Sequence, residues 1–226
     1  MIVTIDRLLF PDELVQAQSL LKAAAWADGR ITAGPQAALV KNNQQLPEDD
    51  PQLATLRRLV LQALARNASF FAAALPLTVL PPFFNRYAGA SNAYGAHVDG
   101  AMRQAPDGSY VRSDLSATLF LSDPENYEGG ELSIADTFGT HRIKLPAGSL
   151  VLYPSSSVHE VTPVTHGERI ACFMFIQSMV RDAGQRRLLY EMDMALLQLR
   201  ETIGETDAVV QLTGTYHNLL RQWSET

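Results

Sequence analysis

The chain has 226 residues, of which 46% are hydrophobic and 19% are charged, a composition typical of a globular protein with a substantial core. Its 18 basic and 24 acidic side chains give a formal net charge of −6, which excludes the basic surface expected of a protein that binds nucleic acid or anionic lipid. The single cysteine excludes an intramolecular disulfide, and the absence of a leader-like start or a long apolar run predicts a cytoplasmic protein.

The first part of the chain, residues 1–76, is predicted to be helical after a short leading strand. Pro11-Asp12-Glu13 begins one helix and Asp49-Asp50-Pro51 begins another, since proline and acidic residues are favoured in the first turn. Apolar side chains then recur at helical spacing, so both helices are predicted to pack on the core through one face. These positions are Leu14, Ala17, Leu20, Leu21 and Ala24 in the first helix, and Leu53, Leu56, Val60, Leu64 and Ala68 in the second.

The middle part, residues 77–178, alternates short β-rich runs with turns of glycine, proline, asparagine and aspartate. Many short strands at this spacing predict a sandwich or jelly roll. The predicted strands are Thr78–Tyr87, Leu115–Leu121, Glu131–Ile134, His141–Leu145, Ser149–Tyr153, Val158–Thr162 and Arg169–Ile176. The fold class that follows is mainly β with flanking helices.

The last part, residues 179–226, is predicted to be helical again. Its apolar faces are expected to cover the β core, and a homodimer interface is the alternative. The residues on these faces are Leu188, Leu189, Met192, Leu196 and Leu199, followed by Val209, Leu212, Tyr216, Leu219 and Leu220.

His97 and Asp99 form the first candidate for chemistry, because residues i and i+2 of a strand point to the same face. An imidazole and a carboxylate placed in this way could bind one cation. The pair alone is weak evidence, since a chain with five histidines and thirteen aspartates produces such a pair readily by chance. A surface histidine beside a loop aspartate is the simpler interpretation of the pair alone.

His159 changes that interpretation, because it lies in a second strand candidate and is flanked by apolar residues that direct it inward. Two histidines and one carboxylate make a facial triad that leaves three positions of an octahedral metal open, an arrangement typical of non-haem Fe(II) enzymes. We therefore predict that His97, Asp99 and His159 are metal ligands and catalytic. His166, in a turn, is the fallback third ligand, and His141 and His217 are expected to be structural.

Arg169 begins the strand candidate that follows His159. A guanidinium on a buried strand needs an anion, because an unpaired buried charge is costly. A dicarboxylate co-substrate could accept two parallel hydrogen bonds from it. The alternative is a salt bridge to Glu131 or Glu168.

Two tyrosines precede His97 and could line the same pocket, where a phenol can hydrogen-bond a carboxylate. Tyr94 is predicted to contact the co-substrate, with packing in the core as an even alternative, and core packing is favoured for Tyr87. The turn Glu128-Gly129-Gly130-Glu131 would allow the backbone to approach the site closely. Cys172 is expected to be a buried strand residue rather than a nucleophile.

With these residues in place, the chain resembles the 2-oxoglutarate and Fe(II)-dependent dioxygenases of the prolyl-4-hydroxylase-like branch. It is most similar to the bacterial PKHD-type hydroxylases associated with iron uptake, and the resemblance extends over nearly the whole length. The strings that carry it are Val40-Lys41-Asn42-Asn43-Gln44-Gln45, Phe84-Asn85-Arg86-Tyr87, Tyr94-Gly95-Ala96-His97-Val98-Asp99-Gly100, Asp114-Leu115-Ser116-Ala117-Thr118-Leu119-Phe120-Leu121-Ser122, Tyr153-Pro154-Ser155-Ser156-Ser157 and Tyr216-His217-Asn218-Leu219-Leu220-Arg221.

The resemblance implies a double-stranded β-helix, or jelly-roll, dioxygenase domain over residues 77–178, with an N-terminal helical region (1–76) and a C-terminal helical extension (179–226). It implies that Fe(II) is bound by the three predicted ligands, that Arg169 binds the distal carboxylate of 2-oxoglutarate, and that ascorbate keeps the iron ferrous. The expected reaction is hydroxylation of an unidentified small-molecule or peptidyl substrate, with release of succinate and CO2.

Two other classes of protein stay open at this point. One is a non-catalytic jelly-roll module that senses iron or 2-oxoglutarate. The other is a cupin-like enzyme that uses Zn or Mn without 2-oxoglutarate, and Arg169 argues against it because such chemistry needs no buried anchor for a dicarboxylate.

Overall fold

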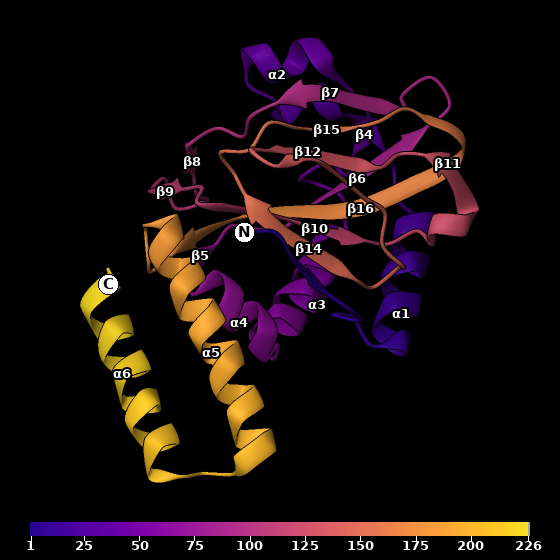
Figure 1. The fold of residues 1–226 in the computed structure, drawn as a ribbon. Helices are drawn as coiled ribbons and strands as arrows, with labels where there is room; N and C mark the ends of the chain where they lie inside the picture. The colour runs from indigo at the N-terminus through magenta and orange to yellow at the C-terminus, as the bar shows by residue number, and fades with distance from the viewer. Residues whose placement is uncertain (226) are drawn as a thin grey trace.

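Two antiparallel sheets form the centre of the computed structural model, which describes residues 1–225 (Figure 1). The large sheet runs in the order β1-β14-β10-β16-β6-β4-β2, with β5 and β11 also paired to β16. Its strands are β1 (Val3–Ile5), β2 (Ala27–Asp28), β4 (Gln44–Gln45), β5 (Pro76–Val79), β6 (Phe83–Ala88), β10 (Leu115–Phe120), β11 (Tyr127–Gly129), β14 (Leu150–Pro154) and β16 (Val164–Ser178).

The small sheet runs in the order β13-β12-β15-β7-β3, and a separate pair of strands, β8 and β9, follows β7 along the chain. These strands are β3 (Lys41–Asn42), β7 (Ala93–His97), β8 (Met102–Gln104), β9 (Tyr110–Arg112), β12 (Leu132–Asp136), β13 (Gly139–Ile143) and β15 (His159–Val161). Apolar side chains from both sheets meet in one cluster that contains Phe120 of β10 and Ile134 of β12. The two sheets therefore pack face to face.

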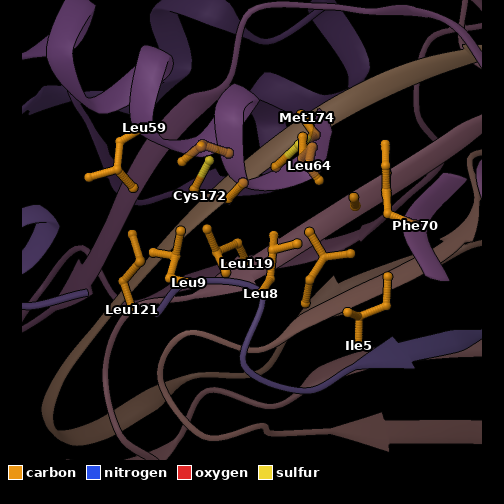
Figure 2. Packing of buried hydrophobic residues seen from close by; sticks show 14 of the residues in the cluster. Ile5, Leu8, Leu9, Leu59, Leu64, Phe70, Leu119, Leu121, Cys172 and Met174 are labelled. Carbon is orange, nitrogen blue, oxygen red and sulfur yellow. The ribbon is translucent and has the colours of Figure 1, made fainter. Parts of the chain in front are cut away.

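The outer face of the large sheet is covered by α1 (Pro11–Lys22), α3 (Leu53–Ala65) and α4 (Ala68–Ala74). Strand β10 shows that both faces of this sheet must be covered. All six of its residues are buried, and alternate residues point to opposite faces. Leu119 points to the helices, whereas Phe120 points between the sheets. Figure 2 shows the helix-facing cluster, in which side chains of α3 such as Leu59 gather with Cys172 and Met174 of β16.

The predicted second N-terminal helix is two helices, α3 and α4. The chain turns at Asn67, whose side-chain oxygen accepts a hydrogen bond of 2.8 Å from the backbone N–H of Phe70 and so caps α4. Ala68 consequently leaves the predicted apolar stripe and is exposed. The turn-rich stretch between the first and second predicted helices holds a 3-10 turn, η1 (Gly29–Thr32), the short helix α2 (Pro35–Val40) and three of the two-residue strands.

The predicted strand Thr78–Tyr87 is interrupted, so that β5 and β6 are separate. Pro81 and Pro82 lie between them, and proline cannot donate to a ladder of hydrogen bonds. Strand β16 is longer than predicted and spans 15 residues. The other predicted runs correspond to β10, β12, β13, β14 and β15 within two residues at each end. Strands β7, β8, β9 and β11 were not among the predicted strand ranges, and a second 3-10 turn, η2 (Pro124–Asn126), precedes β11.

The C-terminal helices α5 (Ala183–Ile203) and α6 (Asp207–Trp223) form a hairpin that extends away from the sheets, in contrast to the expected cover over the β core (Figure 1). They pack on each other and on Leu75, at the end of α4, through a separate apolar cluster. Leu188 and Leu212, predicted to lie on the packed faces, are exposed. Among the described residues, no helix is long and apolar enough to cross a membrane.

Candidate active site

The small sheet brings the two predicted histidine ligands together. His97 ends β7 and His159 begins β15, and the antiparallel pairing of these strands places the two residues directly opposite each other. Their ring centroids are 4.3 Å apart, and both side chains are buried. The residues are 62 positions apart in the chain, so that only strand pairing makes them neighbours.

Both imidazoles have the same orientation relative to their own backbone. The Nδ1 atom of His97 lies 2.8 Å from the carbonyl oxygen of Gly95, and Nδ1 of His159 lies 3.0 Å from that of Ser157. Because a carbonyl only accepts, each Nδ1 carries a proton and donates it, which leaves the lone pair of each Nε2 free for a metal. Burial and the neighbouring His159 lower the pKa of His97, and this keeps its ring neutral.

Asp99 follows β7 and turns to the same side as His97. Its Oδ2 atom lies 3.6 Å from Nε2 of His159 and accepts a hydrogen bond of 2.6 Å from Ser116 of β10. The hydroxyl of Ser116 is in turn 2.7 Å from that of Ser155. Two buried serines, Ser116 on β10 and Ser155 in the turn after β14, thus orient the carboxylate that follows β7.

Ligand atoms of His97, Asp99 and His159 all lie within 4.8 Å of one another, so that the described part of the chain contains a ready cation site. Two imidazoles and one carboxylate are the donor set of a facial triad and fit Fe(II). His141, His166 and His217 are exposed and lie outside this group, which removes the need for His166 as a fallback.

Arg169 of β16 is the largest fully buried side chain and has an exposed fraction of only 1%. None of its three guanidinium nitrogens has a hydrogen-bond partner among the described residues. The alternative partners are engaged elsewhere, since Glu168 pairs with Arg86 and Glu131 accepts from Thr162. A buried cation without a protein acceptor fits an anionic ligand that arrives from solution.

Gly130 makes room for this arginine. The glycine has φ +66°, and a Cβ at its position would lie 3.1 Å from Cδ of Arg169 and 2.8 Å from Cγ2 of Val164. A larger residue would force Val164 and the stem of Arg169 to shift, and its side chain would also strain the backbone at this positive φ. The close approach of backbone that the double glycine suggested therefore occurs at the arginine.

A cavity of about 380 Å³ connects the triad with Arg169. Tyr94 lines it and stacks on the ring of His97 at 3.7 Å between centroids, while Tyr87 lies below the guanidinium at 5.1 Å. Tyr87 thus borders the cavity as well as the core. Phe173 lines the cavity as well, whereas Leu119 packs on the helix side.

Lys41 and Arg103 also line the cavity, and neither was a candidate from the sequence. Lys41 lies on β3, where it is buried, and burial lowers the pKa of its ammonium group to about 8. Arg103 lies on β8, four positions after Asp99. The available signals were weak: an isolated lysine before a polar run, and an arginine in a segment without a clear period.

Cys172 is fully buried among apolar side chains of the helix-facing cluster. Burial raises the pKa of its thiol well above the ordinary value, so that it stays protonated and unreactive. The structure accords with a packing role.

Two family models match the chain. The model of the 2OG-Fe(II) oxygenase superfamily matches residues 82–177, and the model of the PKHD-type hydroxylase C-terminal domain matches residues 183–225. A PKHD-type hydroxylase of Nitrosomonas eutropha is 71% identical over 226 residues, with 100% of both chains covered. The α5–α6 hairpin therefore corresponds to the C-terminal domain of the PKHD-type hydroxylases.

Solved structures of low sequence identity share the fold. A prolyl hydroxylase from Trichoplax adhaerens, in complex with a hypoxia inducible factor peptide fragment, has a TM-score of 0.54 at 16% identity, covering 83% of this chain and 86% of that chain. HygX from Streptomyces hygroscopicus, with nickel and 2-oxoglutarate bound, has a TM-score of 0.52 at 14% identity, covering 76% and 81%. The predicted fold class, mainly β with a jelly-roll core and flanking helices, is confirmed.

Proposed function

The chain belongs to the PKHD-type hydroxylase family of 2OG-Fe(II) oxygenases, and from this premise we propose that its cavity hydroxylates a C–H bond of a substrate held beside the triad. The protein is an enzyme, a 2-oxoglutarate-dependent dioxygenase. In the overall reaction one oxygen atom of O2 enters the substrate as a hydroxyl group. The other enters succinate as 2-oxoglutarate loses CO2. The observation that carries the proposal is the convergence of the three ligand atoms with an unpaired arginine in one cavity.

We assign His97, Asp99 and His159 to Fe(II), because their donor atoms converge and their outer atoms are fixed by Gly95, Ser157 and Ser116. When bound, the iron supplies the activation of dioxygen that no side chain can provide. The chain's own contribution is to fix both imidazoles through their Nδ1 atoms and to hold the carboxylate in a single orientation.

We assign Arg169 to the distal carboxylate of 2-oxoglutarate, which would satisfy its unpaired guanidinium with charge-assisted hydrogen bonds. Tyr94 borders the triad, and burial raises the pKa of its phenol, so that it is a neutral wall of the same pocket and a contact for the co-substrate. Aromatic and apolar residues around the triad exclude water from the reacting centre.

The test is succinate formation by purified protein with Fe(II), 2-oxoglutarate and oxygen. His97→Ala or Asp99→Ala should lower the rate at least about 100-fold, since the loss of mere supporting contacts at metal sites already costs about 10- to 100-fold. His166→Ala removes an exposed histidine of the same strand-rich region and should match the wild type. Full turnover in either triad variant, or a loss of turnover in His166→Ala, would contradict the assignment of the metal ligands.

Two finer proposals rest on the family resemblance. We propose that ascorbate keeps the iron ferrous, so that ascorbate should increase the number of turnovers before inactivation; an unchanged number would contradict this.

We also propose that the substrate is linked to iron uptake. The amount of the protein should then rise when cells are depleted of iron, and a constant amount would remove this link.

A further inference from the structure

Lys41 is a buried cation to which the described residues bring no carboxylate within salt-bridge distance, while Asp28 and Asp99 act on it from farther away. Its ammonium nitrogen donates to two neutral oxygens, Oγ1 of Thr32 and Oε1 of Gln45, each at 3.1 Å. It also lies 5.5 Å from the ring centroid of Tyr94 and 5.7 Å from that of Phe173. An ammonium group has three N–H donors, so that one is left for a ligand in the cavity.

Arg103 is a second cation of the cavity and is half-buried, with 27% of its side chain exposed. Its guanidinium carbon lies 3.4 Å above the ring centroid of Phe175, and its buried Nε has no hydrogen-bond partner in the described part of the chain. The contact of its terminal nitrogen with Asp99 is 3.5 Å, longer than a well-formed charge-assisted bond. Once Asp99 serves a metal, this arginine has no strong acceptor left.

The charges in the cavity do not balance. Asp99 is the single carboxylate among the residues of the described chain that line it, against Lys41, Arg103 and Arg169. In the net charge of the loaded cavity, the charges of Fe(II) and 2-oxoglutarate cancel. The negative charge of Asp99 then cancels one of the three positive side-chain charges. The cavity of the loaded enzyme therefore keeps an excess of positive charge at Lys41 and Arg103, and this excess is costly at Lys41, which is buried.

Both cations contact one aromatic wall of the cavity, which consists of Phe83, Phe173 and Phe175. Phe83 and Phe173 stack at 5.2 Å, and Phe173 meets Phe175 edge to face at 5.9 Å. Lys41 lies over Phe173 and Arg103 over Phe175, so that the wall presents apolar surface with positive charge beside it. Such a wall matches a ligand that has an apolar body and an anionic group.

We propose that Lys41 and Arg103 bind the carboxylate of the substrate, which is a small organic acid whose apolar body lies on the Phe83–Phe173–Phe175 wall. This inference rests on the proposed function, because the wall and the triad share one cavity. The small size follows from the cavity: about 380 Å³ must hold the co-substrate as well, and α2 residues such as Pro35 border it.

The experiment compares organic acids with their uncharged amides. The protein is loaded with Ni(II) in place of iron, so that no turnover occurs, and with saturating 2-oxoglutarate. Benzoate and benzamide, phenylacetate and phenylacetamide, and hexanoate and hexanamide are titrated by calorimetry. At least one acid should bind about 10- to 100-fold more tightly than its amide, which is the value of charge-assisted hydrogen bonds.

Two variants identify the groups responsible. Lys41→Gln and Arg103→Gln should each reduce the preference for acid over amide about tenfold, and Lys41→Arg should retain most of it. The matched controls are Lys22→Gln on α1 and Arg142→Gln on β13, both exposed, which remove the same charges outside the cavity. They should keep the wild-type preference.

The outcomes are distinct. Equal binding of acid and amide by wild-type protein that binds 2-oxoglutarate overturns the inference alone, and needs no variant to fold. Failure of the wild type to bind 2-oxoglutarate counts against the proposed function, and the inference falls with it. A preference that survives in both glutamine variants also overturns the inference. So does tighter binding of an acetylated glutamate-containing peptide than of any small acid.

Discussion

The two faces of strand β16 have opposite surroundings: one face lies in the apolar core and the other borders the cavity. On the helix side, Cys172, Met174 and Ile176 belong to one apolar cluster, in which each is fully buried. On the inner side, Arg169 and Phe173 border a cavity with unpaired polar atoms. One strand thus carries a sealed core and an incomplete site on alternate residues.

The difference separates stability from function. The helix side is complete without any ligand, because its apolar groups satisfy one another through packing. On the inner side, the guanidinium of Arg169 has no hydrogen-bond partner among the described residues, and it is satisfied only when a ligand arrives. Substitutions on the two sides should therefore change different measurable quantities.

The largest expected effect lies on the helix side. Leu119→Ala removes a fully buried side chain from the cluster that α1, α3 and α4 share with the large sheet, and should lower the free energy of unfolding by about 2–5 kcal/mol. Urea denaturation measures this loss. The KM for 2-oxoglutarate should stay unchanged at temperatures where the variant is folded. A large rise in KM with little loss of stability would contradict the separation of the two faces.

The buried ammonium group of Lys41 in the cavity should make the free energy of unfolding depend on pH. Burial lowers the pKa of Lys41 from 10.5 to about 8, and Arg103 nearby adds to this shift. Between these values the unfolded chain binds more protons than the folded one, so stability rises with pH across this window. The gain is on the order of 3 kcal/mol between pH 8 and 10.5.

Lys41→Met removes this dependence. The difference in unfolding free energy between wild type and variant should therefore move in favour of the wild type by ~3 kcal/mol as pH rises from 8 to 10.5. Urea denaturation at several pH values measures it. Lys22→Met, which removes an exposed lysine, should show no such change. A constant difference for Lys41→Met would mean that the ammonium group is not truly desolvated.

Arg169→Gln should affect ligand binding rather than stability. Its guanidinium makes no hydrogen bond within the described chain, so its loss breaks none in the free protein. The KM for 2-oxoglutarate should rise about 100-fold, because two charge-assisted hydrogen bonds to the co-substrate are lost. Arg142→Gln, on the exposed strand β13, is the control. A variant that is strongly destabilised but keeps the wild-type KM would show that the arginine stabilises the fold and does not bind the co-substrate.

The smallest of these effects is expected at Ser116, which supports the metal site from the large sheet. Ser116→Ala removes the 2.6 Å hydrogen bond to Asp99 and should weaken Fe(II) binding about tenfold or somewhat more. Anaerobic titration with Fe(II) measures this. Ser109→Ala, on an exposed loop, is the control. Unaltered metal affinity in Ser116→Ala would show that Asp99 needs no support from the second sheet.

Local patterns predicted much of the structure. The spacing of Leu53, Leu56, Val60 and Leu64 predicted the buried face of α3, because helical periodicity depends only on neighbours in the chain. The spacing of His97 and Asp99 likewise predicted that both turn to one side. The predicted single helix and the single strand before Tyr87 were wrong where Asn67 and the Pro81-Pro82 pair interrupt them.

By itself, the sequence determined which side chains share a face and that Arg169 would need an anion, since alternation and the cost of a buried charge are local facts. Only the tertiary structure decided what those faces meet. The pairing of β7 with β15 sets His97 opposite His159, and β10 brings Ser116 to Asp99. The aromatic wall under Lys41 and Arg103 arises in the same way, from strands far apart in the chain. Such contacts depend on long-range packing, for which a single sequence carries no periodic signal.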